Sequence, residues 1–338
     1  MSSPSTPISD HRRDGSWVDD SILDGFQQLT IPLPGARMAP GEPESSPLTG
    51  TLVRRHPPQR RSALLYLHGW SDYFFQSHLA EAVERMGHDF HALELRRYGR
   101  SLAPGQLAGF VGTLDDYFEE LDRAVGILRE DHDQVVLMGH STGGLTASLW
   151  ADARPGAIDA LVLNSPWLDL QASWVVAVLT GRVTRMLSVS RPTAVLKLSD
   201  NGFYLRSLDP ATGGEWEVDP ALKGPENFFV RAGWLAAVLA GHDRVAKGLS
   251  IEAPVLLLTS GRSDFRRVWD EAMREADTVL DVERIMARGA QLGDHVTLVR
   301  LPGGMHDLAL SRGPVRDRYF DEVERWLTAY LGLGREAH

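Results

Sequence analysis

The sequence predicts an α/β fold with a mostly parallel central sheet that is interrupted by a helical insertion. The first observation is a series of short apolar segments, typical of buried strands, that alternate with segments of helical periodicity. The second is a Gly-x-Ser-x-Gly pattern at residues 139–143, placed between such a strand and a helix start. The third is residues 167–247, where the alternation stops and aromatic side chains accumulate.

The first part of the chain contains most of the alternating elements. A polar segment, residues 1–20, is expected to be poorly ordered or to lie on the surface, and a hairpin of residues 25–33 and 50–55 follows it. Short apolar strands that alternate with helices indicate parallel pairing with helices on both faces. The predicted strands are 63–67, 90–95, 135–138 and 160–163, and the predicted helices are 78–86, 114–129 and 145–153.

The alternation returns after the insertion. Strands are predicted at 255–259 and 296–301, and a last helix at 315–331. These strands need a sheet to join, so we expect one core, residues 21–166 and 248–334, that is interrupted by residues 167–247. The insertion is expected to begin and end in amphipathic helices, near 173–187 and 231–239. It contains four of the nine tryptophans, Trp167, Trp174, Trp216 and Trp234.

Composition excludes several classes of function. The chain of 338 residues is 43% hydrophobic and 24% charged, which is typical of a soluble globular protein. A formal net charge of −10 argues against nucleic acid or an anionic membrane as the main partner. The lack of cysteine excludes disulfides and thiolate catalysis. No secretory signal, membrane-spanning run, metal motif or phosphate-binding motif is visible, so we expect a cytoplasmic protein without cofactor or metal.

The Gly-x-Ser-x-Gly pattern indicates a nucleophile. The chain must turn so sharply from strand to helix that glycine is needed on both sides of the serine. Ser141 is then left at the apex, beside helix N–H groups that can hold a negatively charged oxygen. The pattern predicts acyl transfer through a serine ester, against the plainer interpretation of a tight turn with an incidental serine.

A serine hydroxyl needs a base and an acid that orients the base. His306 is the best candidate for the base, because it lies in a flexible loop after a predicted strand and before the last helix. The acid should follow the strand 255–259. Proximity to that strand favours Asp264, whereas Asp277 comes later, after a helical-looking segment, and Asp281 has the sequence context of a helix N-cap.

An oxyanion hole requires two N–H donors. We expect one from Thr142, directly after the serine, and one from Trp70, in the His-Gly-Trp loop after the strand 63–67. Trp70, His140 and Trp167 are also predicted to contact the substrate, since they come close to the nucleophile in sequence or follow strand ends. The tryptophans of the insertion could equally form the core of a small helical cap.

Together these residues resemble the α/β-hydrolase superfamily, and within it the branch of lysophospholipases, monoacylglycerol lipases and serine aminopeptidase-like enzymes. The resemblance covers residues 50–331 and rests on His-Gly at 68–69, Gly-His-Ser-Thr-Gly-Gly at 139–144 and Pro-Gly-Gly-Met-His at 302–306. It implies an α/β-hydrolase fold, with the insertion as a cap over the nucleophile. It also favours Asp277 as the acid, because that branch often has Asp-x-Val-x-Asp there, with Asp264 and Asp281 as alternatives.

The chain departs from the branch at one turn. The branch often has Asp-x-Arg-Gly-x-Gly-x-Ser after the second parallel strand, where this chain has Glu94 for the first residue and Arg97 for the first glycine. We expect an atypical turn there that touches no catalytic group.

The resemblance implies hydrolysis of a small-molecule carboxylic ester, with an apolar acyl group or a monoglyceride- or lysophospholipid-like structure. The protein could form a homodimer. The same residues could instead serve an acyltransferase or a lactone-, thioester- or amide-processing enzyme. A catalytically silent protein that binds a ligand is a further alternative.

Overall fold

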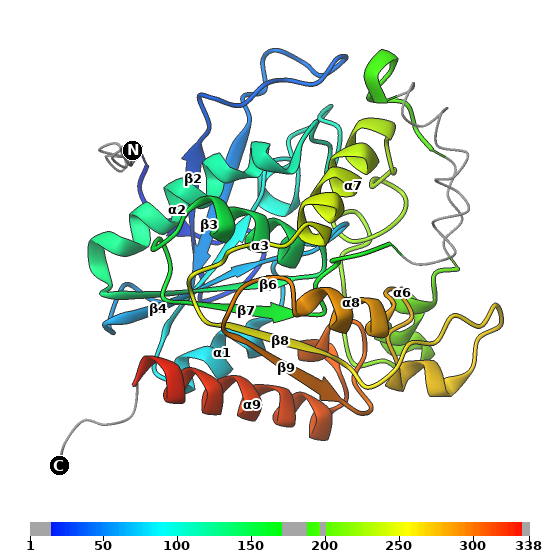
Figure 1. Ribbon diagram of the computed structural model, residues 1–338. Helices are drawn as coiled ribbons and strands as arrows, with labels where there is room; N and C mark the ends of the chain where they lie inside the picture. Colours follow the sequence, from blue (N-terminus) through cyan, green and yellow to red (C-terminus); the bar gives the residue numbers. More distant parts are fainter. Residues whose placement is uncertain (1–14, 171–187, 197–200, 333–338) are drawn as a thin grey trace.

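A computed structural model describes residues 15–170, 188–196 and 201–332. Across these residues nine strands form a single sheet in the order β1-β2-β3-β5-β4-β6-β7-β8-β9 (Figure 1). The strands are β1 (Val18–Asp19), β2 (Gln27–Pro32), β3 (Thr49–Arg54), β4 (Ser62–Leu67), β5 (Asp89–Glu94), β6 (Gln134–His140), β7 (Ala160–Asn164), β8 (Val255–Ser260) and β9 (Val296–Leu301).

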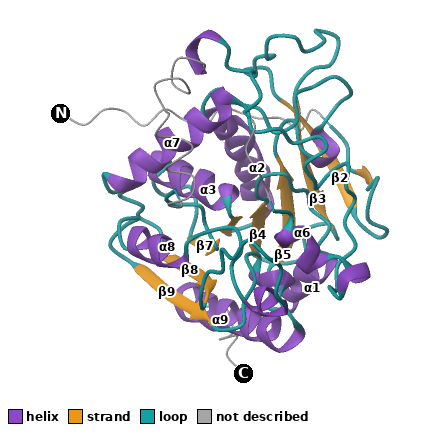
Figure 2. Ribbon diagram, turned by 90° about the vertical axis from the view of Figure 1, so that its right-hand side faces the viewer, coloured by secondary structure: helices purple, strands orange, loops and turns teal. Residues whose placement is uncertain are grey.

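The sheet is mostly parallel, as predicted. Strands β1, β2, β3 and β5 pair in an antiparallel manner, which confirms the first hairpin, and all pairs from β5 through β9 are parallel. Figure 2 shows β9 and β2 toward opposite edges of the sheet. Because the central strands are parallel, the loops after them meet at one edge, and this is where the predicted site residues belong.

Helices cover both faces of the sheet (Figure 1). Side chains of α1 and α9 enter the apolar core on one face, and side chains of α2, α3, α7 and α8 enter the core on the other. A short helix, α6, lies in the insertion. The helices are α1 (Ser77–Arg85), α2 (Phe118–Asp131), α3 (Thr142–Ala153), α6 (Phe203–Leu208), α7 (Ala232–Ala246), α8 (Val282–Gly289) and α9 (Gly313–Leu331).

Several elements differ from the sequence prediction. The helix expected at 114–129 begins as a 3-10 turn, Leu114–Tyr117, before α2. The helical-looking segment after Asp264 contains only the 3-10 turn Glu271–Glu275, since Arg262 and Arg266 are engaged with Asp264 at its start. The helix expected near 231–239 is α7, which continues to Ala246. The helix expected at 173–187 lies outside the described residues.

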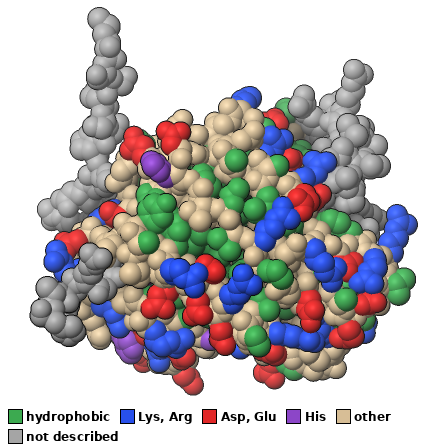
Figure 3. Space-filling view, turned by 60° about the horizontal axis from the view of Figure 1, so that its bottom comes forward, with side chains coloured by type: hydrophobic (Ala, Val, Ile, Leu, Met, Phe, Trp, Pro, Cys, Tyr) green, Lys and Arg blue, Asp and Glu red, His purple; other side chains and the backbone are tan. Residues whose placement is uncertain are grey.

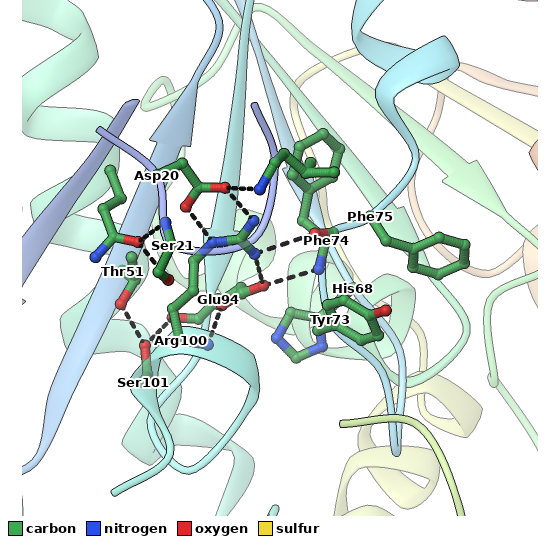
Figure 4. Close-up of polar contacts among 12 residues, drawn as sticks. Asp20, Ser21, Thr51, His68, Tyr73, Phe74, Phe75, Glu94, Arg100 and Ser101 are labelled. Carbon is green, nitrogen blue, oxygen red and sulfur yellow. Dashed lines mark hydrogen bonds and ion pairs between the residues drawn. The ribbon is translucent and has the colours of Figure 1, made fainter. Parts of the chain in front are cut away.

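The N-terminal segment is part of the sheet from Val18 onward. Its Asp20 forms a bidentate ion pair with Arg100, at 2.5 and 2.6 Å, in which both side chains are buried. Arg100 also contacts Glu94 at 2.5 Å (Figure 4). Glu94 accepts a further hydrogen bond from the backbone N–H of Phe74 at 2.8 Å. The atypical turn therefore ties the chain start to the loop that follows β4.

Arg97, the other departure in this turn, has a φ of 66°, the left-handed region that glycine adopts without strain. Its guanidinium forms a buried bidentate pair with Glu42, at 2.7 and 2.6 Å, and donates to the carbonyl of Phe110. This buried pair fixes the side chain and offsets the backbone strain.

Three buried histidines are held neutral by the fold. Burial lowers the pKa of His88 to about 4, of His91 to about 3 and of His242 to about 4. Burial lowers the pKa of His132 as well, but its hydrogen bonds to Asp89 and to the carbonyl of Leu128, together with the charges of Asp89 and Asp131, outweigh burial and raise the pKa. An unfolded chain would protonate all four near their ordinary pKa of about 6.5.

We expect the free energy of unfolding to fall as pH decreases from about 7 to about 4. In that window the unfolded state takes up protons on His88, His91 and His242 that the folded state does not, whereas His132 and Glu120, whose pKa values are raised in the folded state, act in the opposite direction. Urea unfolding at a series of pH values measures this slope. His88→Gln should make it shallower, and an unchanged slope in that variant would contradict the assignment.

Candidate active site

Ser141 occupies a strained turn between β6 and α3. Its backbone has a φ of 53° and a ψ of −119°, a conformation that non-glycine residues adopt only when their surroundings enforce it. The Ser141 N–H donates to the carbonyl of Asn164 at 3.1 Å, and its own carbonyl accepts from Trp167 at 2.9 Å. These bonds to the end of β7 hold the serine at the carboxyl edge of the sheet.

Glycines allow the chain to pack closely around this turn. A Cβ on Gly143 would overlap the carbonyl oxygen of His68 and lie 2.7 Å from that of Leu67. A Cβ on Gly69 would lie 3.1 Å from the Cβ of Ser141. The loop after β4 therefore rests directly on the first turn of α3, and any side chain at these glycines would push the two apart.

His306 is oriented by a buried carboxylate. Its Nδ1 lies 2.9 Å from Oδ2 of Asp277, and both side chains are almost fully buried. The other carboxylate oxygen of Asp277 accepts the N–H groups of Val279 and Leu280 at 2.8 and 2.7 Å. With Nδ1 engaged in this way, Nε2 is the imidazole nitrogen that can accept a proton from a reaction partner.

The structure brings this pair to the serine turn. The ring of His306 lies 4.8 Å, centroid to centroid, from the ring of His140, the residue before Ser141. The ring of Tyr204, from α6 of the insertion, packs edge-on against the imidazole of His306, with ring centroids 5.4 Å apart. Ser141 follows β6, Asp277 comes after β8 and His306 after β9, so all three lie at the carboxyl edge of the sheet.

The two alternative aspartates serve other contacts. Asp264 is bound by Arg262 and Arg266, and these hydrogen bonds hold its pKa well below the ordinary value. Asp281 caps α8 by accepting the N–H groups of Glu283 and Arg284, as its sequence context predicted. Neither carboxylate is paired with the imidazole of His306.

Asp264 and Asp277 are neighbours in space, although 13 positions separate them in the chain. The N–H of Asp264 donates to the carbonyl of Asp277, and the N–H of Asp277 donates to the carbonyl of Arg262, both at 2.9 Å. The segment between them leaves the end of β8 and returns to it. In the sequence, proximity to the strand favoured Asp264 and the family pattern favoured Asp277. The two disagreed because both residues flank the same strand end.

Sequence reasoning missed a buried polar pair behind the serine turn. The side chain of Asn164, at the end of β7, donates to Asp307 at 2.7 Å and accepts the N–H of Leu308 at 3.2 Å. It thus connects the strand that anchors Ser141 to the loop that carries His306. A polar side chain at the carboxyl end of a parallel strand was the signal that could have identified it.

The remaining predicted site residues also lie around Ser141. Trp70 follows Gly69 in the loop that touches the serine. Thr142 is the first residue of α3, and the first N–H groups of a helix have no hydrogen-bond partner within that helix. Burial lowers the pKa of His140, whose Nδ1 lies 3.1 Å from the carbonyl of Asn164. The hydrogen bond from the backbone N–H of Trp167 to the carbonyl of Ser141 places that tryptophan beside the turn.

An aromatic cluster forms next to this turn. The ring of Trp70 lies 3.7 Å from that of Trp234, on α7, and 5.8 Å from that of Phe228. Trp234 also lies 6.1 Å from Trp167. Trp216 is different, because it stacks on His78 and donates to the carbonyl of Leu310, which anchors the insertion to the core away from the cluster. The tryptophans of the insertion therefore fall into two groups, with Trp234 in the cluster beside the serine turn and Trp216 at the contact between insertion and core.

On the face drawn in Figure 3, acidic and basic side chains of the described residues are interspersed rather than segregated by sign. Within the described ranges, no helix is long and apolar enough to cross a membrane. The same ranges hold no group of three or more His, Asp and Glu side chains arranged to bind a metal ion.

Known proteins resemble the chain over most of its length. Residues 58–311 match the model of the family described as serine aminopeptidase, S33. A monoacylglycerol lipase of Mycolicibacterium smegmatis is 23% identical over 275 residues, covering 80% of this chain and 89% of that protein.

Solved structures agree in fold. The monoacylglycerol lipase of Paleococcus ferrophilus superposes with a TM-score of 0.60 at 17% identity, covering 90% of this chain and 99% of that one. A soluble variant of the Saccharomyces cerevisiae monoglyceride lipase also gives 0.60, at 14% identity over 96% and 99% of the two chains. The predicted fold class is confirmed.

We expect Gly143→Ala to lower the free energy of unfolding by about 1–3 kcal/mol, because the new methyl group meets the backbone of β4 and its loop. Gly126→Ala is the matched control. Gly126 lies within α2, where a Cβ would meet nothing, so the same change should stabilise the protein by about 0.5–1 kcal/mol. Chemical denaturation of both variants measures the difference, and equal effects would contradict the packing argument.

Proposed function

The chain belongs to the serine aminopeptidase S33 family of α/β-hydrolases, and from this premise we propose that it cleaves a carboxylic ester through an acyl-enzyme on Ser141. The observation that carries the proposal is the strained turn at Ser141 beside the buried pair of His306 and Asp277. Nothing in the packing of an ordinary strand-to-helix turn requires a serine held at a φ of 53°.

The proposed reaction begins with proton transfer. Nε2 of His306 takes the hydroxyl proton of Ser141 as Oγ attacks the ester carbonyl, and the imidazolium that forms is stabilised by Asp277. The tetrahedral intermediate then collapses, and His306 gives the proton to the leaving alcohol. Water, activated by the same imidazole, attacks the acyl-enzyme and releases the acid and free Ser141.

The negative charge on the carbonyl oxygen would be held by two backbone N–H groups, those of Thr142 and Trp70. Thr142 stands at the first turn of α3, where the helix dipole favours negative charge. The close approach of Gly69 to Ser141 brings the loop of Trp70 to the same place. Donors fixed in advance in a mostly buried site stabilise such charge most strongly.

The substrate class follows from the surroundings of the serine. We infer that the described part of residues 167–247 acts as a cap, and that Trp70, Trp167 and Trp234 contact an apolar acyl chain or alcohol. The monoacylglycerol lipases among the relatives support a monoglyceride-like ester. An acyltransferase or a silent ligand-binding protein would use the same framework, and the experiments below separate these from a hydrolase.

Removing the nucleophile or its orienting acid should abolish turnover while the fold is retained. We expect Ser141→Ala to eliminate hydrolysis of a nitrophenyl ester and labelling by a fluorophosphonate probe. Asp277→Asn should lower kcat by about 10⁴-fold, because an amide stabilises neither the imidazolium nor the correct tautomer of His306.

Asp264→Asn is the matched control for the acid, since Asp264 is bound to arginines instead of His306. It should retain kcat within about three-fold. Full activity in Asp277→Asn would reject that aspartate as the acid, and lack of a covalent adduct on wild-type Ser141 would favour a silent binder. Product analysis with a competing alcohol present distinguishes hydrolysis from acyl transfer.

The aromatic cluster should determine the preference for acyl length. We expect Trp234→Leu to lower kcat/KM for an octanoyl ester by about ten-fold or more and to leave an acetyl ester within about three-fold. Trp216→Leu alters a cap tryptophan outside the cluster and should keep the wild-type ratio of the two substrates. An identical ratio in both variants would remove Trp234 from the binding site.

A further inference from the structure

A buried ion pair joins the insertion to the loop that approaches Ser141. The ammonium of Lys223 lies 2.5 Å from Oδ1 of Asp72, and the exposed fractions of the two side chains are 4% and 1%. Lys223 comes from the insertion and Asp72 from the loop after β4. The reaction proposed above uses neither residue, and their pairing across 151 positions was not predicted from the sequence.

We propose that Lys223 is a positioning residue that holds the loop of residues 69–73 in the geometry needed for its N–H group at Trp70 to bind the oxyanion. The inference rests on the proposed function, because it assigns a role in the same reaction. It makes the cap a part of the machinery for charge stabilisation, in addition to any contact that it makes with substrate.

Three contacts join the insertion to the loop after β4. Besides the ion pair, the hydroxyl of Ser71 accepts the N–H of Gly224 at 3.0 Å and donates to its carbonyl at 3.3 Å. The hydroxyl of Tyr73 accepts the N–H of Asp219 at 3.0 Å. Three consecutive residues, 71, 72 and 73, thus each bind the insertion at a position between 219 and 224.

The backbone of this loop is strained. Ser71, the residue after Trp70, has a φ of 50°, a conformation that costs free energy for a residue with a Cβ. The Trp70 N–H belongs to the peptide between Gly69 and Trp70, directly before this strained residue. The orientation of that N–H therefore depends on contacts that keep Ser71 in place.

Among the described residues, the core hydrogen-bonds to this loop at its two ends, whereas Trp70 between them packs its ring on Tyr98 and Trp234. At its start, the ring of His68 accepts the N–H of Leu95 at 3.2 Å. At its end, Glu94 accepts the N–H of Phe74 at 2.8 Å, as Figure 4 shows. The middle of the loop, at Ser71 and Asp72, is the part that the insertion holds through Gly224 and Lys223.

The burial of the pair makes it suited to this task. An ion pair that water cannot reach is not screened by salt, and its breakage would leave an unpaired buried charge. The second carboxylate oxygen of Asp72 is buried without a hydrogen-bond partner in the described structure, so Lys223 is the main compensation for this charge. The ammonium also lies 5.7 Å from the ring of Tyr204, which contacts His306.

The test compares a double variant, Lys223→Met with Asp72→Asn, with the wild type. Removing both charges avoids the unpaired buried carboxylate that would destabilise the single variant. We expect kcat for a nitrophenyl ester to fall by about 10- to 100-fold and KM to change by less than about three-fold. A complete loss of one donor costs about 10²–10³ in kcat, and a displaced donor should cost less.

A second measurement reports on the oxyanion directly. A trifluoromethyl ketone with an apolar chain accepts Oγ of Ser141 at its carbonyl carbon, the carbonyl electrons move to its oxygen, and the serine proton passes to His306. We expect the affinity for this ketone to fall in proportion to kcat/KM in the double variant. The affinity for the matching alcohol, which develops no oxyanion, should remain within about three-fold.

Arg316→Met is the control, because Arg316 joins α9 to Glu215 of the insertion without touching the loop after β4. It should keep wild-type kcat and ketone affinity. Ser71→Ala removes the bonds to Gly224 without removing a charge, and should lower kcat by about three- to ten-fold. It provides the test if the double variant does not fold.

The proposal is overturned if the folded double variant keeps kcat and ketone affinity within three-fold of the wild type, or if Arg316→Met loses as much. Ser71→Ala with wild-type kcat would overturn it equally. Failure of the proposed function has a different signature, since the wild type would then neither hydrolyse esters nor be labelled at Ser141.

Discussion

The close contact between the loop after β4 and the first turn of α3 is the constraint on which the rest of the site depends. The backbone of Leu67 and His68 lies so near Gly143 that no Cβ fits between them. Gly69 in turn lies against Ser141. This contact brings two segments that are far apart in the sequence together beside Ser141, whose backbone has a positive φ.

Different neighbouring residues hold Ser141 and His306 in place. Asn164 binds the backbone of Ser141 and, through its side chain, the loop that carries His306. Asp277 fixes the imidazole, and its remaining oxygen is occupied by backbone N–H groups, so the carboxylate cannot turn away. Ser141 and His306 are thus each held by a neighbour that is itself hydrogen-bonded, which keeps their geometry rigid.

The insertion contacts several of the loops that surround Ser141. Arg274 donates to the carbonyls of Ser207 and Thr212, and so connects the segment between Asp264 and Asp277 with the insertion. Tyr204 packs on His306, and Lys223 binds the loop after β4. The insertion is thus in contact with the loops that carry Asp277, His306 and Trp70. Its sequence, rich in aromatic residues, suggested a binding surface or a cap core, but not this role.

Local patterns in the sequence were enough to predict the fold class, most of the alternating strands and helices, and the candidates Ser141 and His306. Alternating apolar periods and a glycine-flanked serine are short-range signals, and they follow directly from the geometry of strands and tight turns. The pairing of His306 was decided by tertiary structure. Asp264 and Asp277 reach the same strand end, where Asp264 binds Arg262 and Arg266 and Asp277 binds His306.

The ion pairs of Asp20 with Arg100 and of Lys223 with Asp72 could likewise not be predicted from the sequence. Each joins residues that are distant in the chain, and a charged side chain carries no local sign of whether folding will bury it or leave it in water. Periodicity and turn chemistry are properties of neighbouring residues, whereas the partner of a buried charge is set by which segments the completed sheet brings together.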